Sequence, residues 1–329
     1  MVRIISIFLI SLLVATSCAN SGNKSDANSD IISLVNSIAN SEPAVVKFDS
    51  LVYNDIFADS LDLNVIVEVP KRQGWGRDLP ALNGDVAEVE VTQFATKVES
   101  GKFVKSDFED RAVYKFNRRG DVVEKREYFP DGSLWAKCIY TYNADGRMLE
   151  QAWYNRKDSL DWVAHYNYKA NGACYEEVTN NSNGTIKNRT IFRYNSKGRR
   201  IEEITYDGEG DLQWLVFCSY DENGNMMSDM GYYSDGTFDY KHLYMYNAEG
   251  KVLEEVDCDE EGRPLSAIVY EYDSKGRMVE ECVYAESNSP GAKWSYKYDS
   301  KGNVIKVTPC DVAQEAHNII TEYKITYRK

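Results

Sequence analysis

Histidine is scarce in this sequence, and the motifs by which enzymes and metal sites are usually recognised are missing. The chain holds 3 histidines, His165, His242 and His317, and none has the spacing to cysteine or carboxylate residues that a zinc site needs. A glycine-rich phosphate loop, a nucleophile elbow and a Cys/His motif are all lacking. The sequence therefore predicts no cofactor and no bound metal, and it favours a protein that is not an enzyme.

Long hydrophobic runs and excess positive charge are also lacking. After the apolar run Ile4–Val14, no segment reaches the roughly 20 apolar residues that a membrane-spanning helix needs. The net charge is -14, and such a surface repels phosphate backbones, which argues against nucleic acid as a partner. These features indicate a soluble exported body.

The N-terminus is typical of an export signal. A basic residue, Arg3, precedes the run Ile4–Val14, and the small residues of 15–17 precede Cys18. We expect residues 1–17 to be a signal peptide and Cys18 to accept a lipid, because this arrangement resembles a bacterial lipobox, although Ala15 stands where leucine is usual. Ordinary cleavage after Ser17, without lipid, is the alternative.

The residues that follow Cys18 predict how the chain is anchored. Residues 18–30 are rich in Ser, Asn, Gly and Asp, which predicts a flexible tether. We expect a bacterial outer-membrane lipoprotein, exposed on either the periplasmic or the cell-surface side, that touches the membrane only through the lipid on Cys18. Residues 31–87 are interpreted as a small N-terminal segment.

Glycines at a constant spacing of 26 residues define the repeat. They are Gly120, Gly146, Gly172, Gly198, Gly224, Gly250, Gly276 and Gly302. Four residues before each glycine lies an aromatic residue: Phe116, Tyr142, Tyr168, Tyr194, Tyr220, Tyr246, Tyr272 and Tyr298. A second turn recurs within most units, as in Asp131-Gly132, while Asp158 and Asn288 replace its glycine in two of them. A period of this length is the signature of a repeat architecture.

Each unit is predicted to be one β-hairpin. Asn or Asp opens each turn and glycine supplies the positive φ. Between the turns, side chains such as Leu134, Ala136, Cys138, Tyr140 and Tyr142 alternate on a two-residue period. We therefore predict an all-β fold of tandem antiparallel hairpins over residues 88–310, forming an extended, twisted or coiled sheet, with a sheet that closes on itself as the alternative. Residues 311–329, with alternation from Ile319 to Tyr327, are expected to form a capping strand.

The recurring string Tyr-x-Tyr-Asn/Asp-x-x-Gly-Arg/Asn, as in Tyr270 to Arg277 and Tyr296 to Asn303, resembles the YD repeat of the RHS family. The resemblance covers about residues 106 to 310. It implies a β-sheet spiral in a surface or toxin-delivery setting, but here the period is longer than usual and no effector domain follows the repeats. The mid-unit string from Tyr128 to Leu134 is also similar to MORN-type repeats.

Acidic residues are the first group to consider as a chemical site. The pairs Glu176-Glu177, Glu202-Glu203, Glu254-Glu255 and Glu280-Glu281 occupy adjacent strand positions, so their side chains point to opposite faces and cannot act together on one bond. We interpret them as solvated strand charges. The acidic turn from Asp257 to Gly262 could hold calcium weakly, but ordinary turn chemistry explains it as well.

The other six cysteines are Cys138, Cys174, Cys218, Cys258, Cys282 and Cys310. An even number in an exported chain is compatible with three disulfides. Their positions in the units differ, and no pair is clearly brought together. We therefore favour buried, reduced side chains.

Aromatic residues supply the candidate binding surface. Trp162, Trp214 and Tyr240 occupy one strand position in different units, on the same side as the periodic tyrosines. Exposed, they would form a platform for a sugar or a protein partner; buried, they would be core residues. The leading hypothesis is a non-catalytic binding or structural surface for a glycan or protein. An enzyme with a site in the N-terminal segment, or a part of a toxin-delivery or adhesion system, is the alternative.

Overall fold

The computed structural model describes residues 79–285, 290–310 and 319–329. Within these ranges the chain forms one antiparallel sheet of 18 strands. The prediction of an all-β fold built from tandem antiparallel hairpins is confirmed. The predicted signal peptide, Cys18, the tether 18–30 and residues 31–78 lie outside the described residues. None of the described residues forms a helix long and apolar enough to cross a membrane.

The strands follow one another along the chain, and each repeat unit supplies two of them. They are β1 Val86–Glu99, β2 Lys102–Phe116, β3 Val122–Tyr128, β4 Leu134–Tyr142, β5 Met148–Asn155, β6 Leu160–Tyr168, β7 Cys174–Asn181, β8 Ile186–Tyr194, β9 Arg200–Asp207, β10 Leu212–Tyr220, β11 Met226–Tyr233, β12 Phe238–Tyr246, β13 Val252–Cys258, β14 Pro264–Tyr272, β15 Met278–Ala285, β16 Pro290–Tyr298, β17 Val304–Pro309 and β18 Ile319–Tyr327. β1 and β2 are the longest, with 14 and 15 residues.

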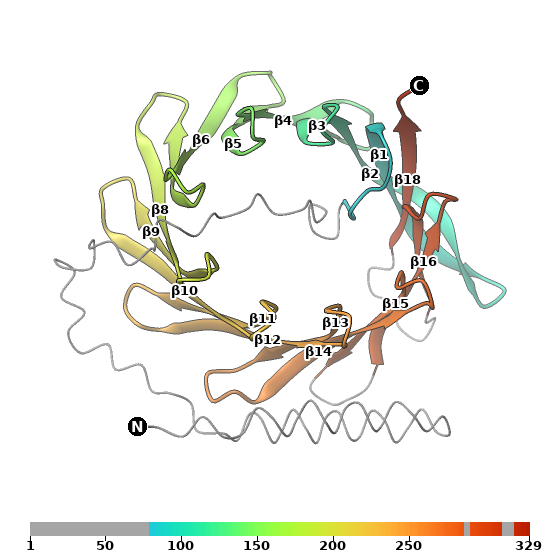
Figure 1. The fold of residues 1–329 in the computed structure, drawn as a ribbon. Helices are drawn as coiled ribbons and strands as arrows, with labels where there is room; N and C mark the ends of the chain where they lie inside the picture. The colour runs from blue at the N-terminus through green and yellow to red at the C-terminus, as the bar shows by residue number, and fades with distance from the viewer. Residues whose placement is uncertain (1–78, 286–289, 311–318) are drawn as a thin grey trace.

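The sheet closes into a barrel, so the expectation of an extended, twisted or coiled sheet was wrong. β1 has a partner on each side, because Val91 lies opposite Ala112 of β2 and opposite Tyr323 of β18. Figure 1 shows the resulting ring, in which the first and last strands lie side by side. Closure removes the two open edges that so large a sheet would otherwise present to other chains.

Two kinds of turn connect the strands, one at each end of the barrel. The turns that follow the periodic aromatic residues, here called tyrosine turns, include 143–147: the Asn143 backbone N–H donates to Arg147 O at 2.9 Å, its side-chain oxygen accepts from Arg147 N at 2.9 Å, and Gly146 has φ 83°. The turns at the other end, here called distal turns, are similar. In one of them Asp158 adopts φ 57° in place of glycine, which Asp tolerates better than most residues.

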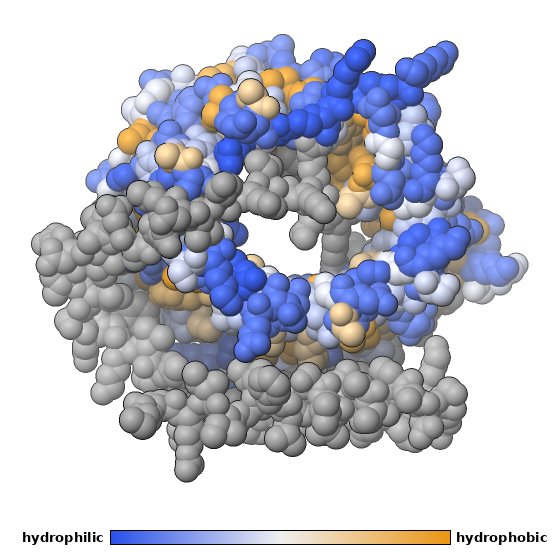
Figure 2. Space-filling model, viewed as in Figure 1, coloured by the Kyte–Doolittle hydropathy of each residue, from blue (hydrophilic) through white to orange (hydrophobic). Residues whose placement is uncertain are grey.

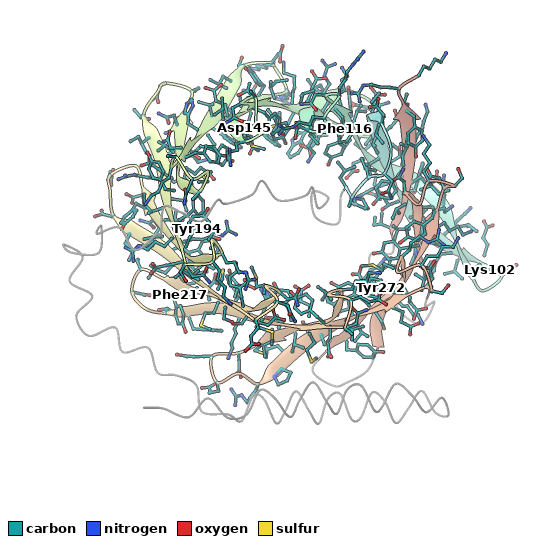
Figure 3. All side chains as sticks on the ribbon, viewed as in Figure 1. Lys102, Phe116, Asp145, Tyr194, Phe217 and Tyr272 are labelled. Atoms are coloured by element: carbon teal, nitrogen blue, oxygen red, sulfur yellow. The ribbon has the colours of Figure 1, made fainter. Side chains whose placement is uncertain are left out.

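The tyrosine turns surround the central opening in the view of Figure 1. Figure 3 shows Asp145, within such a turn, beside this opening, and Lys102 at the tip of the β1–β2 hairpin pointing away from it. Figure 2 shows that mostly hydrophilic residues ring the near mouth of the barrel and that an opening remains in the space-filling view. The barrel is therefore hollow along its axis at this end.

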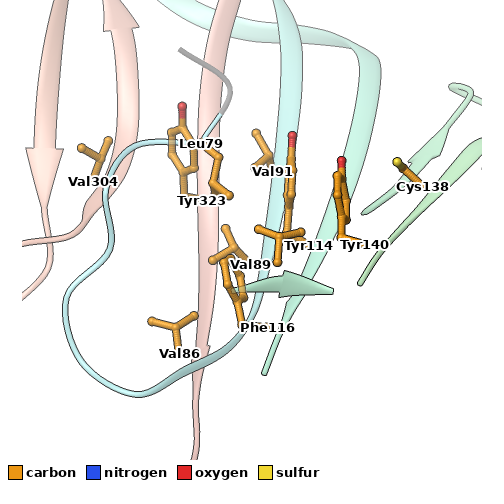
Figure 4. Close-up of a cluster of buried hydrophobic side chains, with 11 residues drawn as sticks. Leu79, Val86, Val89, Val91, Tyr114, Phe116, Cys138, Tyr140, Val304 and Tyr323 are labelled. Carbon is orange, nitrogen blue, oxygen red and sulfur yellow. The ribbon is translucent and has the colours of Figure 1, made fainter. Parts of the chain in front are cut away.

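Leu79 identifies the face of the sheet that lines the barrel. The described chain begins inside the ring in Figure 1, and Leu79 is 1% exposed in a cluster with Val89, Val91 and Tyr114. Figure 4 shows these side chains together beside β1 and β2. Because strand side chains alternate between faces, the residues in line with Tyr114, including the periodic tyrosines, point into the barrel. This surface is called the interior face.

The outer face carries ion pairs between strands, and it also carries an apolar cluster in which Leu243 packs around the buried Val256. Arg193 of β8 and Glu202 of β9 lie 2.8 Å apart, and Arg189 and Glu176 lie 2.6 Å apart. These glutamates fit the interpretation as surface charges. Glu254 does not, because it is 5% exposed on the outer face.

Candidate binding surface on the barrel interior

The periodic tyrosines are held by a repeated hydrogen bond and form what we call the tyrosine ladder. The hydroxyl of each donates to the backbone carbonyl of the residue 20 positions earlier, on the preceding strand. The pairs are Tyr142 with Val122, Tyr168 with Met148, Tyr194 with Cys174, Tyr220 with Arg200, Tyr246 with Met226, Tyr272 with Val252 and Tyr298 with Met278. Because these hydroxyls are used within the fold, the ladder is a structural element of the barrel wall.

A second interior column joins tyrosines to acidic or amide side chains on the neighbouring strand. Tyr244 donates to Asp229 at 2.8 Å, and Tyr296 donates to Glu281 at 2.6 Å. Glu281 is 4% exposed, so the expectation that this residue is a solvated strand charge was wrong. Alternation sends the second glutamate of each predicted pair inward, where a tyrosine hydroxyl donates to Glu255 as it does to Glu281.

Three tryptophans form a contiguous group on β4, β5 and β6, here called the tryptophan row. The rings of Trp153 and Trp162 lie parallel, with centroids 5.8 Å apart and an interplanar angle of 5°. Trp135 meets Trp153 edge to face at 6.2 Å and is 49% exposed. Trp153 also packs against the cluster that contains Leu79, which places this row on the interior face.

The three aromatic residues singled out in the sequence do not form one row. Trp214 and Tyr240 lie together, with ring centroids 6.0 Å apart, whereas Trp162 belongs to the tryptophan row. Periodicity predicts which face a side chain occupies but not which neighbours it meets. Trp153, which completes the stack with Trp162, lies on a different strand position and was missed for that reason.

A cavity of about 210 Å³ adjoins the tryptophan row between β1 and β4. Its lining includes Tyr114, Lys125, Glu127, Phe129 and Trp135. Lys125 Nζ lies 2.7 Å from Glu127 Oε1. Burial alone would lower the pKa of Lys125, but its hydrogen bonds and charge interactions with Glu127 and Tyr114 raise that pKa overall. The lysine is therefore held in its charged form.

A histidine and a carboxylate meet on the interior face of β11 and β12. His242 Nδ1 lies 3.3 Å from Asp229 Oδ2, and Tyr240 packs on the imidazole with ring centroids 4.7 Å apart. The hydrogen bond with Asp229 raises the pKa of His242. Burial alone would raise the pKa of Asp229, but hydrogen bonds from His242 and Tyr244 lower it overall.

Sequence reasoning missed the Asp229–His242 pair because no linear motif encodes it. The hairpin pattern of the repeat would have revealed the pair. Folding the chain about the distal turn at Gly236 pairs residue 229 with residue 242, as the register shows. Folding the chain about the distal turn at Asp158 likewise pairs His165 with Glu150, and His165 Nδ1 lies 3.2 Å from Glu150 Oε1. His317 falls outside the described residues.

Carboxylates also gather on one distal turn. Within the described ranges, Asp207, Glu209 and Asp211 form a group close enough to share a cation. Asp207 Oδ1 accepts hydrogen bonds from the backbone N–H groups of Glu209 and Asp211, at 3.0 and 2.9 Å. Turn chemistry explains this arrangement. In the turn from Asp257 to Gly262, Asp259 is paired with Arg263 at 2.5 Å.

The six cysteines of the repeat region are free thiols in this structure. Cys138, Cys258 and Cys282 are buried, and burial raises the pKa of Cys138. Cys310 is exposed, so the expectation of a buried side chain was wrong there. It follows the last residue of β17 and therefore escapes the packing of the strand interior.

Comparisons with known proteins add little beyond this geometry. No family model matches the sequence, and no curated protein is significantly similar to it. A porin-like protein from Bacteroides uniformis ATCC 8492 is similar in structure, with 9% identity and a TM-score of 0.42 over 74% of this chain and 98% of that one. The TcdB2–TccC3 toxin structures share 13% identity at a TM-score of 0.29, over 72% of this chain and 16% of theirs. The chain therefore spans about a sixth of those toxin chains.

These likenesses do not assign the chain to the RHS family. The sequence resemblance implied a sheet spiral, whereas the described residues form a closed antiparallel barrel of 18 strands. At such identities and TM-scores, the solved structures say nothing about function. The surfaces of the barrel itself are therefore the basis for inferring a function.

Proposed function

We propose that this protein is an exported, non-catalytic binding lipoprotein whose barrel interior takes up a segment of a glycan. The observation that carries the proposal is the tryptophan row, in which stacked Trp153 and Trp162 adjoin the half-exposed Trp135 on the interior face. Aromatic rings offer a broad apolar surface to the C–H faces of sugars, while nearby carboxylates and hydroxyls accept their O–H groups.

The charge of the protein narrows the ligand class. A chain with a net charge of -14 repels polyanions over distances comparable with the Debye length. Acidic side chains such as Glu255 and Glu281 also point into the barrel, where tyrosine hydroxyls donate to them. Both features favour an uncharged glycan over an acidic one.

Charged residues on the outer face argue against a barrel that is embedded in the bilayer by its strands. A barrel that spans a bilayer presents an apolar outer band, and a lysine or arginine there costs about 2–4 kcal/mol at the midplane. Here the outer face carries cross-strand ion pairs such as Arg193–Glu202 and Arg189–Glu176. We propose that a lipid on Cys18 holds the protein at the bacterial outer membrane.

The test is glycan binding by the purified full-length protein. Affinity electrophoresis would compare laminarin, xyloglucan and galactomannan with the acidic polymer polygalacturonate. We expect retardation by a neutral polymer, and the Trp153→Ala variant should bind at least about tenfold more weakly because it loses a stacking surface. Trp294→Ala, on β16, is the matched control and should bind normally.

Three outcomes would overturn the proposal. One is that the wild-type protein binds none of these polymers. Another is that Trp153→Ala binds as tightly as Trp294→Ala while both variants keep the wild-type melting temperature. The third is that the protein degrades one of the polymers, which would favour an enzyme instead.

A further inference from the structure

The cavity between β1 and β4 lies at one end of the tryptophan row and shares a residue with it. Trp135 lines the cavity and also contacts Trp153. The volume of about 210 Å³ is below the roughly 300–1,000 Å³ of pockets that hold drug-sized ligands. A ligand of one ring fits such a space, and a chain leaving it would run onto the tryptophans.

Glu127 gives the cavity an unused hydrogen-bond acceptor. Its Oε1 is engaged by Lys125 at 2.7 Å, whereas its Oε2 is buried and has no hydrogen-bond partner among the described residues. A buried carboxylate oxygen without a donor is costly, by an amount comparable to a lost hydrogen bond. Because this oxygen is closed off from solvent in this structure, a small rotation of the Glu127 side chain is needed to turn it toward the cavity, where a ligand O–H group would supply the missing donor.

The aromatic walls of the cavity suit the apolar C–H face of a sugar ring. Phe129 and Trp135 line the cavity and are 38% and 49% exposed. The C–H groups on the face of a pyranose ring can pack against such aromatic surfaces, while its hydroxyls lie in the ring's periphery. The cavity therefore combines an aromatic wall with a charged acceptor, as a sugar subsite requires.

The first repeat unit departs from the others at these positions. Lys125 is the one cation at its position, where the other units have Gln151, Glu177, Glu203, Asp229, Glu255, Glu281 and Val307. Trp135 is the one aromatic residue at its own position, where the others have Glu109, Asp161, Lys187, Gln213, Asp239, Leu265 and Gly291. A residue set that breaks the repeat pattern at one place is expected at a functional site rather than in the scaffold.

We infer that this cavity is the terminal subsite of the glycan-binding surface and takes one uncharged hexose ring. A ring hydroxyl donates to Glu127 Oε2, and the ring face packs against Trp135. Three carboxylates, Glu109, Asp110 and Glu127, line the cavity against the two cations Arg111 and Lys125, and this net negative charge disfavours an acidic sugar. This inference rests on the proposed function and adds the ligand class of one end of the site.

Titration calorimetry with the full-length protein tests the assignment. The probes are the methyl glycosides of glucose, galactose and mannose, with methyl glucuronide as the acidic counterpart. We expect at least one neutral glycoside to bind and the glucuronide not to bind. Glu127→Gln should weaken the binding by about tenfold or more, since hydrogen bonds to charged groups are the stronger ones. Trp135→Ala, at a half-exposed site, should also weaken it without unfolding the barrel.

Glu202→Gln is the matched control, because Glu202 lies on the outer face and pairs with Arg193. The inference is overturned if Glu127→Gln binds as tightly as this control, or if the glucuronide binds as well as the glucoside. If Trp153→Ala abolishes polymer binding while Glu127→Gln changes nothing, the cavity assignment fails and the proposed function stands. If neither polymer nor glycoside binds, or only a protein ligand does, both fail.

Discussion

The hydroxyl of Tyr142 donates a 2.7 Å hydrogen bond to the backbone carbonyl of Val122, 20 residues earlier in the chain. The same bond recurs in each successive unit of the tyrosine ladder, with the last linking Tyr298 to Met278. Each one spans the open end of a hairpin whose other end is closed by a distal turn. The periodic tyrosine thus fastens the two strands at the end where the chain leaves the hairpin.

Removing one hydroxyl of the ladder should weaken the barrel modestly. Tyr194→Phe deletes the donor to Cys174 O, which lies 2.8 Å away, and we expect a loss of about 1 kcal/mol in the free energy of unfolding. Chemical denaturation measures it. Tyr175→Phe, at an exposed position, should change stability by less than about 0.5 kcal/mol. Equal effects of the two substitutions would show that the ladder bonds contribute nothing.

Gly231 makes room for the contact between Trp214 and Tyr240. A Cβ atom at Gly231 would lie 2.4 Å from Tyr240 Cε1 and 3.0 Å from Trp214 Nε1. Gly231→Ala should therefore destabilise the protein by about 1–3 kcal/mol and alter its tryptophan fluorescence. In a Tyr240→Ala background the shorter of the two contacts is removed and only the one with Trp214 remains, so the penalty of the same substitution should shrink markedly. A penalty that is unchanged in that background would contradict the steric explanation.

The buried carboxyl of Glu254 should make stability fall as the pH rises. Burial raises the pKa of Glu254 to about 7, so the folded state holds this proton more tightly than the unfolded chain. The stabilising contribution is fully present below about pH 4.5 and is lost as the pH rises through 7. Glu254→Gln should therefore exceed the parent protein in stability above pH 7, by up to about 3 kcal/mol.

Denaturation curves at several pH values check this expectation. The stability difference between Glu254→Gln and the parent should shrink toward zero near pH 4.5. Glu202→Gln, on the same face but paired with Arg193 at 2.8 Å, should show no such gain at high pH. A difference for Glu254→Gln that does not vary with pH would rule out the buried carboxyl as its cause.

The pair of Asp229 and His242 should be visible in an NMR titration. The raised pKa of His242 gives stability that is present below about pH 6.5 and is lost as the pH rises through the folded value. The lowered pKa of Asp229 gives stability that is lost as the pH falls through its own folded value. Asp229→Asn should lower the pKa of His242, because burial then acts without its main counter-charge.

Asp257→Asn is the comparison for that titration. Asp257 lies opposite His242 on the other neighbouring strand and acts on it only through its charge. Its replacement should shift the pKa of His242 less than Asp229→Asn does. Equal shifts would mean that the hydrogen bond at 3.3 Å is not what holds the proton on the imidazole.

The hairpins and their faces could be predicted from the sequence because local chemistry specifies them. Asn143 and Gly146 encode a turn by their own bonding and backbone preferences, and alternation places Ala136, Cys138 and Tyr140 on one buried face. These are properties of short segments, so one sequence suffices to find them.

Closure of the barrel could not be predicted, because it depends on contacts between distant residues. Arg328 binds Asp85 at 2.6 Å, and its guanidinium also donates to the carbonyl of Phe116. The candidate site failed to emerge for a related reason. The tryptophan row needs the partner strands of Trp135 and Trp162 to meet at Trp153, and strand register decides that.

The pairing of β1 with β18 has a consequence for the order of folding. A chain made from its N-terminus reaches Val86 long before Tyr327, so β1 waits with one side unsatisfied until synthesis is almost finished. Until then the nascent sheet is open, with two unpaired edge strands and with its tyrosine-rich interior face exposed to solvent. Closure of the barrel is therefore the last step of folding. A truncated or stalled chain keeps its edge strands unpaired, and these can pair with other chains.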